Sequence, residues 1–118
     1  MSRGFRILTF QTAIFVTGAL MLSTLSAMSR AAPAPPAATV EIGNFTFQSP
    51  VLTVKPGTTV TWTNGDDIPH TVVANNGAFK SKVLDTGDRF SVTFAKAGQF
   101  GYFCSLHPHM TGTIVVKA

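Results

Sequence analysis

Apolar and polar residues alternate along short stretches of the chain after residue 38, and turn-forming residues separate these stretches. A period of two places every second side chain on one face, as in a strand with one buried side. The pattern predicts strands over Thr39–Phe47, Val51–Val54, Thr59–Thr63, His70–Ala74, Arg89–Phe94, Gln99–Cys104 and Gly112–Lys117. The turn signals between them include Lys55-Pro56-Gly57, Asn64-Gly65-Asp66-Asp67, Asn75-Asn76-Gly77 and Ala97-Gly98.

No stretch after residue 38 has a helical period, and the least regular segment, 78–88, is expected to form a loop or a helical turn. Many short strands separated by turns are typical of an all-β sandwich or barrel. Seven aromatic residues are expected to supply the apolar area of its core. They are Phe45, Phe47, Trp62, Phe90, Phe94, Phe100 and Phe103.

The first residues have the layout of a secretory signal peptide. Arg3 and Arg6 precede an uncharged, largely apolar run over 7–29, and a Pro/Ala segment, AAPAPPAA, follows at 31–38. We therefore assign 1–34 to a signal peptide and an extended linker, and 35–118 to one domain, exported to the periplasm. An uncleaved membrane anchor is the alternative, because an uncharged run of this length can span a bilayer.

The net charge of +4 comes mostly from this leader. After residue 30 the chain has six basic and five acidic residues, which leaves +1. The remaining basic residues form no stripe of the kind that follows a phosphate backbone. The composition therefore excludes nucleic acid as a partner.

Cys104 is the single cysteine, so it cannot form a disulfide within its chain. The segment Cys104-Ser-Leu-His107-Pro-His-Met110 brings a thiol, an imidazole and a thioether within seven residues, and His70 begins a predicted strand elsewhere. Taken singly, a buried cysteine or methionine is usually a core residue. Together, His70, Cys104, His107 and Met110 make a metal site the better interpretation.

Copper suits this set of donors better than zinc does. Thiolate and thioether are soft ligands for Cu(I), and two His with one Cys and a weak axial Met is the blue-copper arrangement. Zinc accepts Cys and His, but a structural zinc site usually has four such ligands and no thioether. The four donors leave no open position for a substrate, which argues against an enzyme.

The segment from Phe45 to Ala118 resembles the cupredoxins, the plastocyanin and azurin superfamily. The resemblance rests on VLTVKPGTTVTWTN at 51–64, IPHTV at 68–72, GYFC at 101–104 and GTIVV at 112–116. The spacing Cys-x-x-His-Pro-x-Met is similar to the short ligand loop of the amicyanins.

The resemblance implies an eight-stranded Greek-key sandwich that binds one copper ion. His70 would lie inside, and His107 would face solvent within an apolar patch containing Leu106 and Pro108. Met110 would be the axial ligand, and the Thr71 N–H would donate to the Cys104 sulfur. Many cupredoxins have Asn at the position of Thr71, so the resemblance does not predict a side-chain brace there.

The resulting hypothesis is an exported, monomeric blue copper protein that carries single electrons. Its redox partners would be a dehydrogenase, a cytochrome c or an oxidase. The alternative is a periplasmic copper-handling protein for delivery or resistance. A small copper enzyme, or an accessory subunit of one, is a third and weaker possibility. His109 is expected to be an ordinary surface histidine.

Overall fold

The computed structural model describes residues 13–14, 18–19, 23, 31 and 33–118. The predicted signal peptide therefore lies almost entirely outside the described residues. Within the part that is described, no helix has the length and apolar character needed to cross a membrane. All the described strands fall within the unit Ala32–Ala118.

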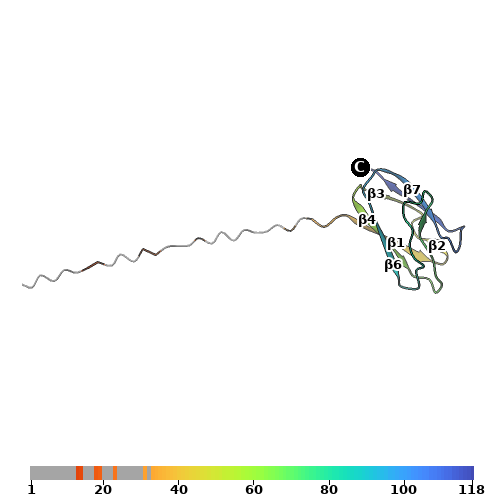
Figure 1. Cartoon of the computed structure of the whole chain (residues 1–118), viewed down its shortest axis with the longest axis horizontal. Coiled ribbons are helices and arrows are strands. Elements are labelled where there is room, and N and C mark those ends of the chain that lie inside the picture. The colour runs from red at the N-terminus through yellow and green to blue at the C-terminus, as the bar shows by residue number, and fades with distance from the viewer. Residues whose placement is uncertain (1–12, 15–17, 20–22, 24–30, 32) are drawn as a thin grey trace, which may run out of the picture. The chain divides into compact units, whose positions relative to one another are not determined.

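Eight strands are present in the described part of the chain. They are β1 (Ala37–Gly43), β2 (Thr46–Phe47), β3 (Val51–Val54), β4 (Thr58–Asn64), β5 (Val73–Ala74), β6 (Arg89–Phe94), β7 (Gly98–Phe103) and β8 (Thr111–Val116). They form two sheets of four strands, in the orders β2-β1-β4-β6 and β3-β8-β7-β5 (Figure 1). The predicted all-β sandwich is confirmed.

The chain passes repeatedly from one sheet to the other, which makes two of the strand pairs parallel. β1 pairs with β4 and β3 with β8 in parallel, whereas β4–β6 and β7–β8 are antiparallel. Such crossings distribute residues from every part of the sequence over both inner faces. Most contacts that hold the sandwich together are therefore long-range.

Strand β4 shows how the alternating pattern builds the core. Its residues alternate strictly between buried and half-buried positions. Val60 and Trp62 point inward, and the Trp62 ring meets Tyr102 of the facing sheet edge-on, with ring centroids 5.3 Å apart. Such an edge-to-face pair adds to the free energy gained by burying the two rings.

One predicted strand is in fact two. The range Thr39–Phe47 breaks after Gly43, because Asn44 and Phe45 have φ angles of 51° and 55°. This left-handed turn directs Phe45 outward, where 53% of its surface is exposed. The prediction that Phe45 belongs to the core was wrong, since the interrupted alternation marks a hairpin and not a continuous strand.

The structure also differs from the sequence predictions at the linker and in the irregular segment 78–88. Ala37 and Ala38 already pair with Thr59 and Val60, so the strand begins two residues before the predicted start at residue 39. Segment 78–88 contains no helix, and two isolated bridges connect it to the preceding strand region instead. One of them pairs Leu84 with His70.

Gly112 makes room for a buried tyrosine. A Cβ atom at this position would lie 2.3 Å from the Tyr102 hydroxyl oxygen. Tyr102 is fully buried, and burial raises the pKa of its hydroxyl, an effect that the nearby Trp62 partly offsets. Its ring cannot move aside easily, because Phe47 and Trp62 pack against it.

We predict that Gly112→Ala lowers the free energy of unfolding by about 1–3 kcal/mol, the usual range for overpacking a core. Gly43→Ala is the matched control, because its Cβ would meet only Gln48 Nε2, at 3.7 Å. Urea unfolding of the metal-free proteins measures both changes. Equal stability of the two variants would contradict this account of Gly112.

Candidate metal centre

His70 is held in the interior by backbone bonds to a distant segment. It exchanges two backbone hydrogen bonds with Leu84, of 3.0 and 2.8 Å. The buried Asn64 side chain donates to the carbonyls of both Ile68 and Leu84, each at 2.9 Å. These bonds join residues 64–70 to segment 78–88. The His70 side chain has no exposed surface.

The segment from Cys104 to Met110 forms a closed loop. Cys104 follows the last residue of β7, and its N–H donates to the Met110 carbonyl at 3.0 Å. Inside the loop, the His107 N–H donates to the Cys104 carbonyl and the Met110 N–H to the His107 carbonyl, at 3.2 and 2.8 Å. The backbone therefore sets the orientation of all three donor residues.

His70, Cys104 and His107 meet at one point. The Cys104 Sγ lies 3.7 Å from Nδ1 of His70 and 3.7 Å from Nδ1 of His107. A sulfur bound at about 2.3 Å and a nitrogen bound at about 2.0–2.1 Å to one ion, about 120° apart, would be roughly 3.7–3.8 Å from each other. The observed spacing fits a thiolate and two imidazoles that share one metal ion.

Met110 belongs to the same end of the molecule. Its side chain is 5% exposed and belongs to the same buried hydrophobic cluster as Cys104. Among the donors, Cys104 and His70 are fully buried, whereas His107 is half-buried. The four residues that the sequence singled out therefore lie at one end of the sandwich, with a single ligand candidate reaching toward solvent.

Thr71 braces the loop from the opposite side. Its N–H donates to the Cys104 Sγ at 3.4 Å, as the resemblance implied. Its hydroxyl oxygen accepts from the Ser105 N–H at 2.8 Å and lies 2.7 Å from the Ser105 hydroxyl. A threonine hydroxyl thus supplies the side-chain brace that the sequence did not predict.

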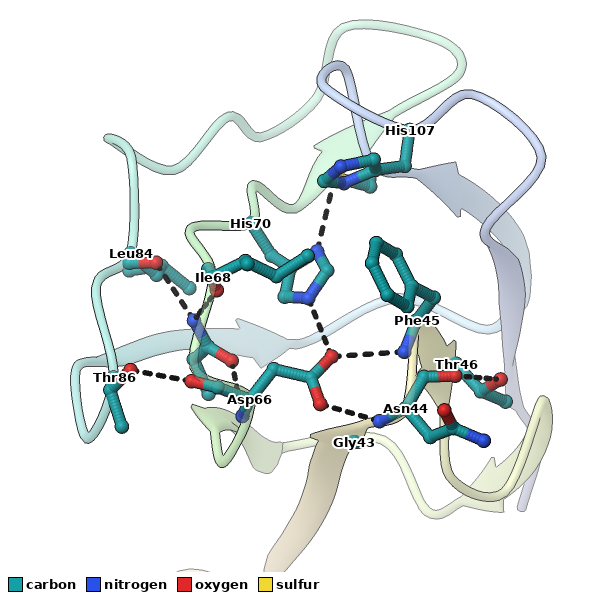
Figure 2. Close-up of polar contacts among 12 residues, drawn as sticks. Gly43, Asn44, Phe45, Thr46, Asp66, Ile68, His70, Leu84, Thr86 and His107 are labelled. Carbon is teal, nitrogen blue, oxygen red and sulfur yellow. Dashed lines mark hydrogen bonds and ion pairs between the residues drawn. The ribbon is translucent and has the colours of Figure 1, made fainter.

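Asp66 is a polar neighbour that the sequence analysis placed only in a turn. Its Oδ2 lies 2.7 Å from Nε2 of His70 and accepts the Phe45 N–H at 2.9 Å, while Oδ1 accepts the Asn44 N–H (Figure 2). The Phe45 N–H, with smaller contributions from His70 and Asn44, lowers the carboxyl pKa against an opposing effect of burial. An ionised carboxylate only accepts, so His70 carries its proton on Nε2 and keeps Nδ1 free for a metal.

Exposed apolar residues lie next to His107, two of them in sequence and one through a ring contact. Phe45 and Leu106 are 53% and 46% exposed, and Pro108 and His109 are exposed as well. The ring of Phe45 meets the His107 imidazole edge-on, with centroids 5.1 Å apart. Leu106 and Pro108 were predicted for this patch, and Phe45 was not.

A two-sheet sandwich with two imidazoles and one thiol gathered at one end defines a protein of the cupredoxin class. Comparison with known proteins agrees. The copper-binding proteins of the plastocyanin/azurin family match residues 36–117. The chain therefore belongs to this family, and copper is the family's metal.

Two amicyanins are among its relatives. The protein from Paracoccus versutus is 34% identical over 115 residues, covering 89% of this chain and 87% of its own. That from Paracoccus denitrificans is 36% identical over 110 residues, with coverages of 86% and 84%. A solved purple cupredoxin from Nitrosopumilus maritimus is 37% identical, with a TM-score of 0.64, and covers 68% of this chain and 99% of its own.

We predict that Thr71→Val destabilises the metal-free protein by about 1–3 kcal/mol, because it leaves the Ser105 N–H without its acceptor. Thr71→Ser keeps the hydroxyl and should cost less. Urea unfolding of the two variants beside the unchanged protein provides the measurement. If valine and serine were equally tolerated, the hydroxyl would have no bracing role.

Proposed function

We propose that this protein is an exported carrier of single electrons that holds one copper ion with His70, Cys104, His107 and Met110. The observation that carries the proposal is the convergence of one ligand atom each from His70, Cys104 and His107 within 4.8 Å of one another. Copper bound to such donors cycles between Cu(I) and Cu(II).

The residues around the donors suit rapid electron transfer, because they resist rearrangement. The loop from Cys104 to Met110 is closed by three backbone bonds, and Thr71 fixes it from outside. His70 is oriented through Asp66. A site that hardly moves when its charge changes avoids a reorganisation cost at each transfer.

The same burial argues against a copper-delivery role. Delivery requires ligands that another protein can reach and replace, whereas His70 and Cys104 have no exposed surface. The protein is not an enzyme; its amicyanin and plastocyanin relatives belong to families of electron carriers. Electron transfer between partner proteins is therefore the function that the site supports best.

We place the docking surface around His107, the half-buried donor. Phe45, Leu106 and Pro108 give this end an exposed apolar surface. An apolar face lets a partner approach closely and leave quickly, since it requires no buried ion pairs to be broken. The partners would be redox proteins, such as a dehydrogenase, a cytochrome c or an oxidase, met by a monomer.

We predict that the purified protein, loaded with Cu(II), shows an intense thiolate-to-copper absorption band that ascorbate bleaches and an oxidant restores. Cys104→Ser should abolish the band, because it removes the thiolate. His107→Ala should alter the band strongly. His109→Ala removes a nearby exposed histidine that is not a proposed ligand, and as the matched control it should leave the band unchanged. A colourless copper complex of the unchanged protein would overturn the proposed ligand set.

Measurement of the electron self-exchange rate and of copper loss to a chelator separates the two functions considered. Fast exchange together with slow copper loss supports an electron carrier. Slow exchange with rapid loss would make copper handling the better assignment, even if the absorption band were present.

Export is the second part of the proposal and rests on the amino-terminal pattern. We expect bacteria producing the full chain to secrete a shortened protein whose first residue lies within 27–35, because a signal peptidase cleaves after small residues. Mass spectrometry of the periplasmic fraction tests this. Leu20→Arg should retain the full chain inside the cell by interrupting the apolar run. An intact chain in the membrane fraction would instead establish an anchor.

A further inference from the structure

The turn between β1 and β2 has a backbone conformation that its own residues disfavour. Asn44 and Phe45 both have positive φ angles, of 51° and 55°. A bulky aromatic residue rarely occupies this left-handed region, so the surrounding structure must hold it there. Strained backbone of this kind is often found at functional sites, so the group that holds this turn is of interest for function as well as for the fold.

The Asp66 carboxylate holds it. Two successive backbone N–H groups, those of Asn44 and Phe45, point at its two oxygens (Figure 2). Successive N–H groups in a turn form a concave site for an anion. The third donor to the same carboxylate is Nε2 of His70, at 2.7 Å. Asp66 thus joins a turn and a candidate ligand that lie more than 20 residues apart in sequence.

The turn in its left-handed conformation places the Phe45 ring on both histidines. The ring is perpendicular to His107, with centroids 5.1 Å apart and an interplanar angle of 90°. It meets His70 at 5.9 Å and 86°. His107 is half-buried and lies on a loop whose flanking residues are exposed. Its ring also meets the His70 ring, with centroids 5.0 Å apart, so Phe45 and His70 both supply ring contacts to the His107 imidazole.

We propose that Asp66 is a positioning residue for His107 as well as for His70. Its carboxylate fixes the turn at Asn44 and Phe45, and the turn keeps the Phe45 ring against the His107 imidazole. The orientation of an imidazole on the last loop then depends on a carboxylate that does not touch it. The consequence for copper rests on the proposed function, whereas the coupling within the chain does not.

A carboxylate is the one side-chain group of this size that satisfies all three donors. An amide at position 66 has a single acceptor oxygen. If that oxygen faces Phe45 and His70, the amide NH₂ faces the Asn44 N–H. If the oxygen faces Asn44, the amide NH₂ faces the Phe45 N–H and the His70 Nε2–H, and donors then oppose donors. This favours the other tautomer of His70, in which Nδ1 is protonated and cannot bind a metal. Either arrangement loses part of the coupling.

The decisive test uses the metal-free protein, so that it does not depend on electron transfer. Nuclear Overhauser contacts between the Phe45 and His107 rings report the capping arrangement, and slow solvent exchange of the His70 Nε2–H reports the bond to Asp66. Asp66→Asn should weaken both signals. Asp67→Asn, which removes the same charge from the adjacent exposed residue, should change neither.

Undiminished Phe45–His107 contacts in Asp66→Asn would overturn the proposal. If that variant fails to fold, Phe45→Leu decides the matter: it should mobilise the His107 ring while the His70 Nε2–H stays protected. An equally ordered His107 ring in Phe45→Leu would also overturn it. Asp66→Glu, which keeps a carboxylate, should retain more of both signals than Asp66→Asn does.

In the copper-loaded protein, Asp66→Asn should weaken copper affinity by about 10- to 100-fold, the usual effect of removing a group that orients a metal ligand. Phe45→Leu should weaken it less, and the double variant should show less than the sum of the two effects, since both act on His107. Additive effects would mean that Asp66 acts through His70 alone. A protein that binds no copper would refute the proposed function and leave the result on the metal-free protein standing.

Discussion

The register between β5 and β7 is the constraint on which the metal centre depends. Val73 pairs with Phe103 and Ala74 with Tyr102. Continued by two residues along each chain, this register sets Thr71 opposite Ser105, where the brace is found. A slip of one residue would turn every side chain of the shifted strand to the other face. Two segments 34 residues apart would then no longer bring an imidazole and a thiol together.

Near the candidate donors, two buried polar side chains hydrogen-bond to backbone groups. Asn64 and Thr71 are almost fully buried, and each satisfies backbone groups of a segment that carries or supports a donor. Buried polar groups are costly unless they are hydrogen-bonded, so a network of this kind tolerates one arrangement and few others. These hydrogen bonds fix the segments that carry the candidate donors.

The candidate donors also differ in their exposure to water, and only one of them lies near the surface. His70 and Cys104 belong to the interior, whereas His107 lies among exposed apolar side chains. Electrostatic interactions are stronger in an apolar interior than in water, so a buried metal ion would interact strongly with its ligands. The half-buried His107 imidazole nevertheless lies close to the surface. In the proposed function, the buried donors would shield the metal and His107 would give electrons access to it.

What the sequence alone determined is what depends on neighbouring residues. Alternation of apolar residues predicted most of the strands and the two-sheet sandwich, and the loop from Cys104 to Met110 carries its three candidate donors within seven residues. His70 completed the set of donor types, and the resemblance to a known family supported it. These features are local, so they are visible in the order of residues.

Tertiary structure decided the roles of residues whose partners are distant in the chain. Asp66 was expected only in a turn, and Thr71 was expected to donate only its N–H. Yet the Asp66 carboxylate and the Thr71 hydroxyl bind groups that lie more than 20 and more than 30 residues away. Phe45 read as a core aromatic, and only the carboxylate that stabilises its left-handed turn placed it on the surface beside the histidines. Pairing across the sandwich created these contacts, and no local pattern encodes which side chains such pairing will bring together.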